Sequence, residues 1–178
     1  KIKKTSKHFS TRVFNFSIPA YRSKSGEVTC PLAGDCVKFC YAKKGFYLLS
    51  AQYAEKKYEI TKQDNFIDLM IDDIKQKKAN YIRVHDSGDY YSKKYLNKWL
   101  TIAKSLPSVK FYSYTNNVNQ IKKAYSKNEI PNNFDFIFSD SGKQSHLIDT
   151  KKDRHTKIFK SLDDLKKEGF KNASEYDL

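Results

Sequence analysis

The residues of this chain best suited to chemistry are three cysteines in one short segment, residues 30–45, which reads CPLAGDCVKFCYAKKG. Cys30, Cys36 and Cys40 follow the spacing C-x5-C-x3-C, and the chain has no other cysteine. We expect the chain to lie inside the cell, where thiols stay reduced, and an odd number of cysteines cannot all pair in disulfides. The segment therefore predicts that the three thiolates bind a metal ion or an iron–sulfur cluster.

Two kinds of centre fit three thiolates. A structural zinc ion takes four ligands and would need a histidine in addition; the chain offers His8, His85, His146 and His155. A 4Fe–4S cluster is held by cysteine thiolates, so three of them leave one iron open to another ligand. We favour the cluster, with zinc as the alternative.

A second group of reactive side chains is the stretch HDSGD, residues 85–89. His85, Asp86 and Asp89 could form a metal pair or a general acid–base set, and together with Ser87 they could receive an amino group and ribose hydroxyls. The structural alternative is a turn in which Asp86 and Ser87 bond to the backbone and Gly88 supplies a positive φ. We favour a functional site, because a turn needs only part of this group.

These side chains must be positioned by secondary structure, and the pattern is that of repeated βα units. Three short β-rich runs end at His85, near Thr115 and near Ser139, and the first two are followed by amphipathic segments. The repeat distance of about 25 to 29 residues is typical of βα units in a parallel sheet. A further strand near residues 13–18 leads into the cysteine segment, and helices are predicted near residues 46–62, 64–78, 91–107, 117–128 and 161–170.

We therefore predict one α/β domain, residues 1–178, with a mostly parallel sheet, in the form of an incomplete (β/α) barrel. Parallel sheets bind ligands at the carboxyl ends of their strands. The cysteine segment, the HDSGD stretch, Tyr114, Thr115 and Asp140 all fall at such ends. One edge of the sheet would then carry the thiols and the polar side chains together.

The composition points to a polyanionic partner. The formal net charge is +14, and such a charge attracts nucleic acid through a salt-sensitive field. Only four of the basic residues are arginines, which argues against base-specific reading; lysines that only solvate the surface are the alternative. No apolar run approaches the roughly 18 residues that span a membrane, so we expect no membrane partner and a cytoplasmic location.

The cysteine segment, the stretch RVHDSGDYYSKKYLNKWL and the ending HTKIFKSLDDLKKEGF are similar to those of the phage and plasmid family called gene product 88. This resemblance implies a mobile-element origin and signature positions at the three cysteines and residues 85–89, without a reaction. More distantly, the plan resembles that of radical S-adenosylmethionine enzymes, whose usual spacing is C-x3-C-x2-C. That resemblance implies an open iron that chelates S-adenosylmethionine.

Three hypotheses follow. The leading one is a radical-type enzyme acting on a nucleic acid or nucleotide, with Asp86, Asp89 and Tyr114 as catalytic residues and a cofactor pocket formed by His85, Asp86, Ser87, Asp89, Thr115 and Asp140. The second is a nucleic-acid-binding protein in which the metal or cluster is only structural. The third is a metal-dependent nuclease that uses Asp86, Asp89 and Asp140 as ligands of hard ions.

Overall fold

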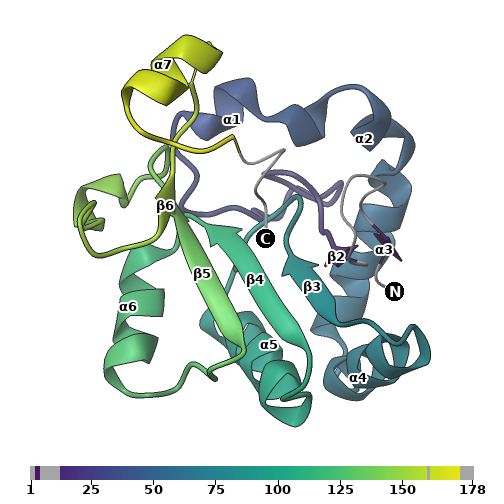
Figure 1. Cartoon of the computed structure of the whole chain (residues 1–178). Coiled ribbons are helices and arrows are strands. Elements are labelled where there is room, and N and C mark those ends of the chain that lie inside the picture. Colours follow the sequence, from purple (N-terminus) through teal and green to yellow (C-terminus); the bar gives the residue numbers. More distant parts are fainter. Residues whose placement is uncertain (1–2, 5–12, 160, 173–178) are drawn as a thin grey trace.

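The computed structural model describes residues 3–4, 13–159 and 161–172. Its centre is a parallel sheet that does not close into a barrel (Figure 1). The strands lie in chain order, and a short strand β1 (Lys3–Lys4) pairs antiparallel with β2 at one edge. The parallel strands are β2 (Val13–Phe16), β3 (Tyr81–Val84), β4 (Lys110–Thr115), β5 (Phe134–Ser139) and β6 (His155–Thr156).

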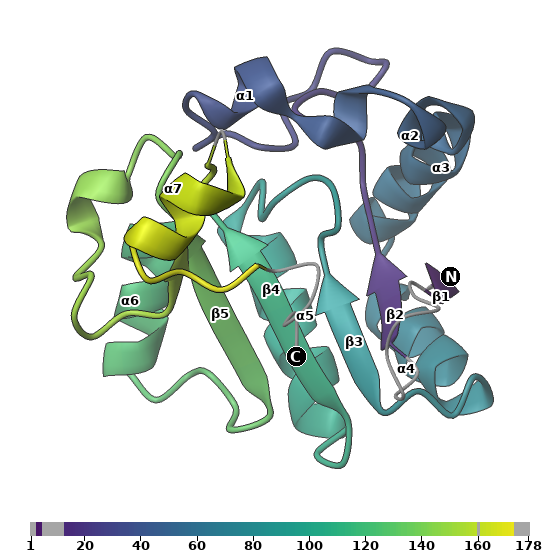
Figure 2. The same ribbon diagram turned by 45° about the horizontal axis from the view of Figure 1, so that its top comes forward.

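The main helices cover one face of this sheet, as Figures 1 and 2 show. Because successive parallel strands are neighbours and crossovers are right-handed, each connecting helix must return on the same side. These helices are α3 (Ala51–Lys62), α4 (Phe66–Gln76), α5 (Lys93–Ser105) and α6 (Val118–Ser126). Shorter helical segments are α1 (Cys36–Phe39), η1 (Tyr41–Lys43), α2 (Phe46–Leu49), η2 (Ser145–Leu147) and α7 (Leu162–Lys167).

The main core lies between the sheet and these helices. Trp99 of α5 is fully buried and packs edge-on against Phe16 and Phe66, with ring centroids 5.2 and 5.7 Å away. This confirms the prediction that the apolar positions of the segment near residues 91–107 face the core. Lys98 on the same helix donates to the carbonyl oxygens of Thr61 and Gln63, at 2.9 and 2.7 Å, and so satisfies backbone acceptors where α3 ends.

The opposite face of the sheet carries a smaller apolar cluster. Val13, Tyr112 and Ile137 are buried there, with Tyr81 and Tyr114 packed against them. Side chains of neighbouring strand residues alternate between the two faces, so Phe14 and Phe16 enter the main core whereas Val13 does not. This alternation places Arg83 and Tyr114, which are in contact, on the face without helices.

The structure confirms the predicted α/β class and the parallel sheet, and it differs from the sequence prediction in detail. The helix expected over residues 46–62 is two helices, because Ser50 lies between α2 and α3 with φ −99° and ψ 1°. The helix predicted near residues 161–170 is α7, and Ser161 caps it, since its hydroxyl accepts from the amide of Asp164 at 3.1 Å. In the described part of the chain, no helix combines the length and the apolar character that crossing a membrane requires.

Candidate functional site

The cysteine segment crosses the carboxyl ends of the parallel strands (Figure 2). After β3, the amide of Asp89 donates to the carbonyl oxygen of Thr29 at 3.1 Å. After β5, Ala33 pairs with Gly142 in an antiparallel bridge, and the amide of Lys143 donates to the carbonyl oxygen of Leu32 at 2.8 Å. The segment is therefore bonded to the ends of two strands that are not neighbours.

A close approach at Gly34 makes the second attachment possible. A Cβ atom at this position would lie 2.6 Å from the carbonyl oxygen of Ser141, which is closer than real Cβ contacts. Only glycine lets the two backbones pass at this distance. The glycine between Cys30 and Cys36 thus fixes the cysteine segment against the turn after β5.

The three cysteines are unpaired and partly exposed. Burial raises the pKa of the Cys30 thiol to about 12, and the negative charges of Asp89 and Cys40 add to this effect. Burial also raises the pKa of the Cys36 thiol, and the negative charge of Cys40 adds to this rise. A hydrogen bond with Ser141 opposes the rise. Cys30 and Cys36 therefore both lie within electrostatic reach of Cys40, so the fold gathers the three thiols at one edge of the sheet.

A site for a single metal ion requires several ligands close together. Two thiolates on one tetrahedral zinc lie only about 3.8 Å apart, given Zn–S bonds of about 2.3 Å. Among residues 3–4, 13–159 and 161–172, no three His, Cys, Asp or Glu side chains are arranged to hold one metal ion. The zinc site with a histidine and the three-aspartate site of a nuclease both need such a group, and neither is formed by these residues.

Asp86 lies at the end of β3 and binds four groups of the protein. Its Oδ2 accepts from Asn15 Nδ2 at 3.1 Å and from Tyr47 Oη at 2.7 Å, and its Oδ1 lies 3.5 Å from Arg83 Nη1. Its carbonyl oxygen accepts from Tyr41 Oη at 2.5 Å. Since Tyr41 and Tyr47 follow Cys40 closely, Asp86 ties the end of the cysteine segment to the sheet.

Asp89 is buried and its carboxylate is bound by the next strand. Its Oδ1 accepts from Thr115 Oγ1 at 2.6 Å and from the amide of Tyr90 at 2.8 Å, and its Oδ2 accepts from the amide of Asn116 at 2.9 Å. Burial raises the pKa of Asp89, and these hydrogen bonds oppose the rise. Thr115 and Asp89, both predicted as site residues, are thus brought together at the ends of β4 and β3.

Ser87 and Gly88 hold the start of the same crossing segment. Ser87 Oγ donates to the carbonyl oxygen of Ile18 at 2.7 Å, and the amide of Ile18 donates to the carbonyl oxygen of Ser87 at 3.1 Å. Gly88 has φ 85°, and a Cβ atom there would lie 2.2 Å from Ile18 Cγ1. The structural alternative for HDSGD is therefore present in part: Ser87 bonds to the backbone and Gly88 has a positive φ, whereas the Asp86 carboxylate bonds to side chains.

His85 lies on the helix side of the sheet, in the core. Its backbone has φ 67°, and its ring packs edge-on against Tyr90 at 4.5 Å. Its Nε2 lies 3.0 Å from Tyr95 Oη, whereas its buried Nδ1 has no partner among the described residues. Burial lowers the pKa of His85 to about 3. Its positive φ thus directs His85 away from Asp86, its neighbour in the sequence.

Tyr114 and Asp140 complete the predicted set. The guanidinium carbon of Arg83 lies 5.0 Å from the ring centroid of Tyr114, so Arg83 connects Tyr114 with Asp86. Asp140 follows β5, and its amide donates to the carbonyl oxygen of Thr156 at 2.9 Å. Its carboxylate is partly exposed and makes no hydrogen bond to the described residues.

Several contributors were not found from the sequence. They are Asn15, Tyr41, Tyr47 and Arg83 around Asp86, Asn116 beside Asp89, and Ser141 beside Cys36. A tyrosine close behind the last cysteine is a signal that could have found Tyr41. Arg83 is only three residues from Asp86, but it precedes the HDSGD stretch and was not included in it. The others are joined across long stretches of chain, and no local pattern marks them.

The family model with the description gene product 88 matches residues 1–177. Comparison with curated proteins and comparison with solved structures give no match. The match covers all of the site described above, from Asn15 to Ser141.

Proposed function

The chain belongs to the gene product 88 family, and we propose that Cys30, Cys36 and Cys40 hold a 4Fe–4S cluster with one iron left open, in a radical-type enzyme. The family description, that of a phage-type gene product, names no reaction. The proposal is therefore built from the cysteine segment and its surroundings. It includes S-adenosylmethionine as the ligand of the open iron.

The observation that carries the proposal is the position of the thiols. Three cysteines within eleven residues lie over the carboxyl ends of a parallel sheet whose strands follow chain order. In parallel α/β proteins this edge is where ligands bind and chemistry occurs.

The number of thiols favours a cluster over zinc. A structural zinc ion takes a fourth ligand, whereas three thiolates can hold a cubane with one iron left open. Cys30 and Cys36 both lie within electrostatic reach of Cys40. The raised pKa values of Cys30 and Cys36 mean that both thiols keep their protons until a cationic centre displaces them.

When bound, such a cluster would supply an electron at the iron that no cysteine ligates. The protein's own residues then divide into two roles. Asp86, Ser87, Asp89 and Thr115 position the cysteine segment, because their polar atoms are used in bonds to this segment, to the chain that flanks it, or to one another. Asp140 and Tyr114 are proposed to contact the ligand, and the partly exposed carboxylate of Asp140 suits an amino group.

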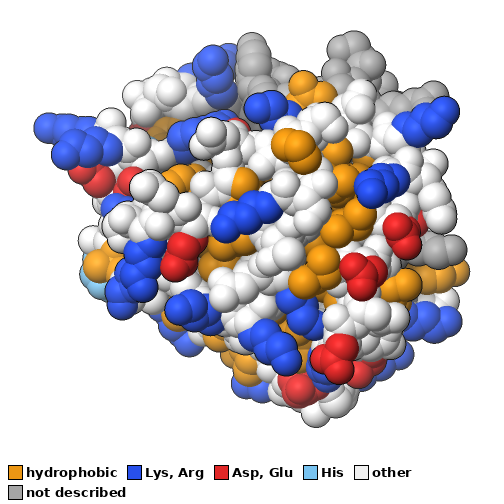
Figure 3. All heavy atoms as spheres, turned by 90° about the horizontal axis from the view of Figure 1, so that it is seen from below, with side chains coloured by type: hydrophobic (Ala, Val, Ile, Leu, Met, Phe, Trp, Pro, Cys, Tyr) orange, Lys and Arg blue, Asp and Glu red, His pale blue; other side chains and the backbone are white. Residues whose placement is uncertain are grey.

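A nucleic acid or nucleotide is the proposed substrate, on the basis of the net charge of +14. This charge is spread widely. On the face seen in Figure 3, Lys and Arg side chains lie among Asp and Glu side chains and do not gather in one patch. The diffuse charge would attract a polyanion from a distance, and a defined binding site must be sought elsewhere on the molecule.

Electron paramagnetic resonance of protein purified without oxygen and reduced with dithionite tests the open iron. Addition of S-adenosylmethionine should change the spectrum, because a ligand on the open iron alters its environment. Asp140→Asn should require more S-adenosylmethionine for the same change, whereas Asp72→Asn, an exposed substitution on α4, should not. A cluster spectrum that S-adenosylmethionine leaves unchanged would contradict this ligand.

A further inference from the structure

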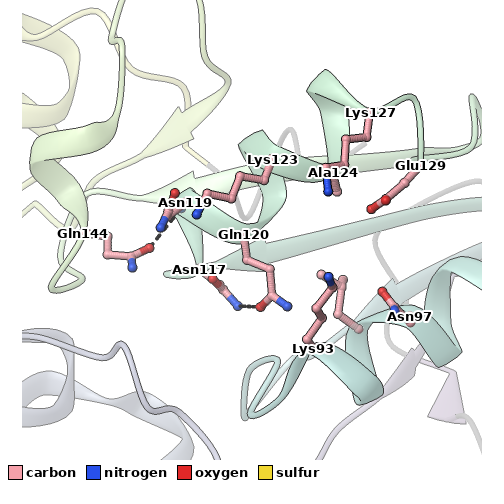
Figure 4. Close-up of a pocket in the computed structure, with 11 residues that line it drawn as sticks. Lys93, Asn97, Asn117, Asn119, Gln120, Lys123, Ala124, Lys127, Glu129 and Gln144 are labelled. Atoms are coloured by element: carbon pink, nitrogen blue, oxygen red, sulfur yellow. Dashed lines mark hydrogen bonds between the residues drawn. The ribbon is translucent and has the colours of Figure 1, made fainter.

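A pocket separate from the cysteines lies between α5 and α6. It has a volume of about 280 Å³ and is shown in Figure 4. Its polar lining consists of the lysines 93, 123 and 127, the carboxamides of Asn97, Asn117, Asn119, Gln120 and Gln144, and Glu129, over a floor that includes Leu96 and Ala124. The lining therefore combines an excess of positive charge with groups that both donate and accept hydrogen bonds.

The lysines of this pocket are available to a ligand. Lys93, Lys123 and Lys127 are exposed, and their ammonium groups have no ion pair or hydrogen bond among the described residues. Other lysines of the same region are engaged, since Lys122 pairs with Asp153 at 2.5 Å. Three unpaired ammonium groups around one hollow form a site for an anion.

Three carboxamides of this pocket, those of Asn117, Gln120 and Gln144, are held by hydrogen bonds. Asn117 is only 5 % exposed, and its Nδ2 donates to Gln120 Oε1 at 2.6 Å. Gln144 Oε1 accepts from the amide of Asn119 at 3.0 Å. In Figure 4 these four residues gather toward one end of the pocket with Lys123 beside Asn119, and Lys93, Lys127, Asn97 and Glu129 lie toward the other end. Carboxamides and lysines thus line the pocket together.

The pocket adjoins the cysteine site through two loops. Asn117 follows Asn116, whose amide donates to Asp89, and Gln144 follows Lys143, whose amide donates to the cysteine segment at Leu32. A ligand in the pocket would therefore lie beside the same edge of the sheet that carries the thiols. This gives the pocket a direct structural connection with the proposed reaction site.

We infer that this pocket binds one phosphorylated nucleotide unit, with its phosphate among Lys93, Lys123 and Lys127 and its base near the carboxamides. The unit comes either from a free nucleotide or from a single nucleic-acid strand. The inference rests on the proposed function only in that it names the position of the substrate; the binding itself needs no cluster.

The test is the affinity for a fluorescent single-stranded oligonucleotide, measured by anisotropy over a series of salt concentrations. The double variant Lys123→Gln/Lys127→Gln should bind more weakly, and its slope of log affinity against log salt should fall by about 0.7, the value for the one phosphate contact that the pocket makes. The matched control is Lys56→Gln/Lys104→Gln, which removes two exposed lysines outside the pocket. Equal slopes for the two double variants would overturn the inference.

A single isosteric substitution at Gln120 provides a second test of the pocket. Gln120→Glu can still accept from Asn117 Nδ2 but places a negative charge in the pocket, so it should weaken oligonucleotide binding. Gln52→Glu makes the same change at an exposed position on α3 and should bind as the wild type does. If both glutamate variants bind alike, the pocket is not the site.

Adenosine monophosphate, added as a competitor, distinguishes the two sources of the nucleotide. Displacement of the oligonucleotide supports a free nucleotide as occupant, and binding that depends on the pocket without displacement supports a strand. The same titrations on Cys36→Ser separate this inference from the proposed function. If Cys36→Ser loses iron but still binds the oligonucleotide through the pocket, both the proposed function and the pocket are upheld. If the wild type contains no iron but binds through the pocket, only the pocket is upheld.

Discussion

At the scale of single residues, Asp86 is the side chain on which the candidate site depends most. It accepts hydrogen bonds from Asn15 and Tyr47 and pairs with Arg83, and it is largely buried. The tyrosine belongs to the segment that carries the cysteines, whereas the other two groups belong to the sheet. A carboxylate in this position holds the two parts together.

Asp86→Asn keeps the shape of the side chain and removes its charge. The charge of Arg83 then loses its partner, and one acceptor becomes a donor facing Asn15 or Tyr47. We expect the free energy of unfolding, measured with urea, to fall by about 1 to 3 kcal/mol. The control is Asp72→Asn, at an exposed position of α4, which should change it by less than about 0.5 kcal/mol. Equal losses in the two variants would show that Asp86 does not hold the segment.

His85 predicts a dependence of stability on pH. Burial lowers its pKa to about 3 in the folded chain, against an ordinary value of 6.5. As the pH falls below about 6.5, His85 binds a proton in the unfolded chain but not in the folded chain. The free energy of unfolding therefore decreases progressively toward pH 3. This one group contributes a slope of up to about 1.4 kcal/mol per pH unit. Asp89, whose pKa is raised, acts in the opposite direction at the acid end.

His85→Asn should remove that slope from the free energy of unfolding, measured with urea at several pH values between 4 and 7. Asparagine is chosen because it tolerates the positive φ of this position. Asp89 is present in both proteins, so its effect cancels in the difference. His146→Asn, an exposed substitution, should keep the wild-type pH profile. A profile of His85→Asn parallel to the wild type would mean that the folded chain protonates His85 readily.

At the scale of elements, the segment between β2 and α3 spans the carboxyl edge of the sheet. Its attachments are the bond between Thr29 and Asp89, the bridge between Ala33 and Gly142, and the tyrosines that reach Asp86. Gly34 allows the closest of these approaches. The geometry of the cysteines therefore depends on backbone fit as much as on side chains.

Gly34→Ala should detach this segment from the turn after β5. Amide hydrogen exchange of residues 30–45 should become faster, and iron retention should fall, because the added Cβ would meet the carbonyl oxygen of Ser141 at 2.6 Å. Gly26→Ala is the control within the same crossing segment: its φ of 87° costs stability, but its Cβ meets nothing within 4 Å. Faster exchange around the cysteines in both variants would point to general loosening and not to the contact at Ser141.

The elements also show how far the sequence predicts this fold. The repeated β-rich runs and amphipathic segments predict the parallel sheet correctly, because period and turn chemistry are local. The two-residue strands β1 and β6 have no such pattern, and their pairing is decided by neighbours in the sheet. The break between α2 and α3 at Ser50 cannot be predicted either, because the sequence of the two helices forms one continuous amphipathic pattern.

In the candidate site, too, only the features that depend on local sequence patterns were predictable. Its location was predictable, because strand ends share one edge of a parallel sheet. Its internal bonds were not, because they join residues far apart in the chain: Asn15 lies 71 positions from Asp86, and Tyr47 lies 39 positions from it. Likewise, nothing in HDSGD shows that His85 turns into the core while Asp86 faces the cysteine segment.

At the scale of the whole molecule, the fold places two potential binding regions side by side. The cysteines lie over the carboxyl edge of the sheet, and the pocket of lysines and carboxamides lies between α5 and α6 next to that edge. The net charge of +14 would bring a polyanion toward both. The molecule would therefore combine the proposed redox centre with the proposed nucleotide site, and the proposed function depends first on the cluster.

The most direct measurement is the iron, acid-labile sulfide and zinc content of protein purified without oxygen, together with its visible absorption spectrum. We predict about four irons and four sulfides per chain, broad visible absorption, and loss of both in Cys30→Ser, Cys36→Ser and Cys40→Ser. Ser105→Ala, an exposed substitution on α5, should retain them. One zinc per chain without colour, or metal content that the cysteine variants leave unchanged, would contradict the account.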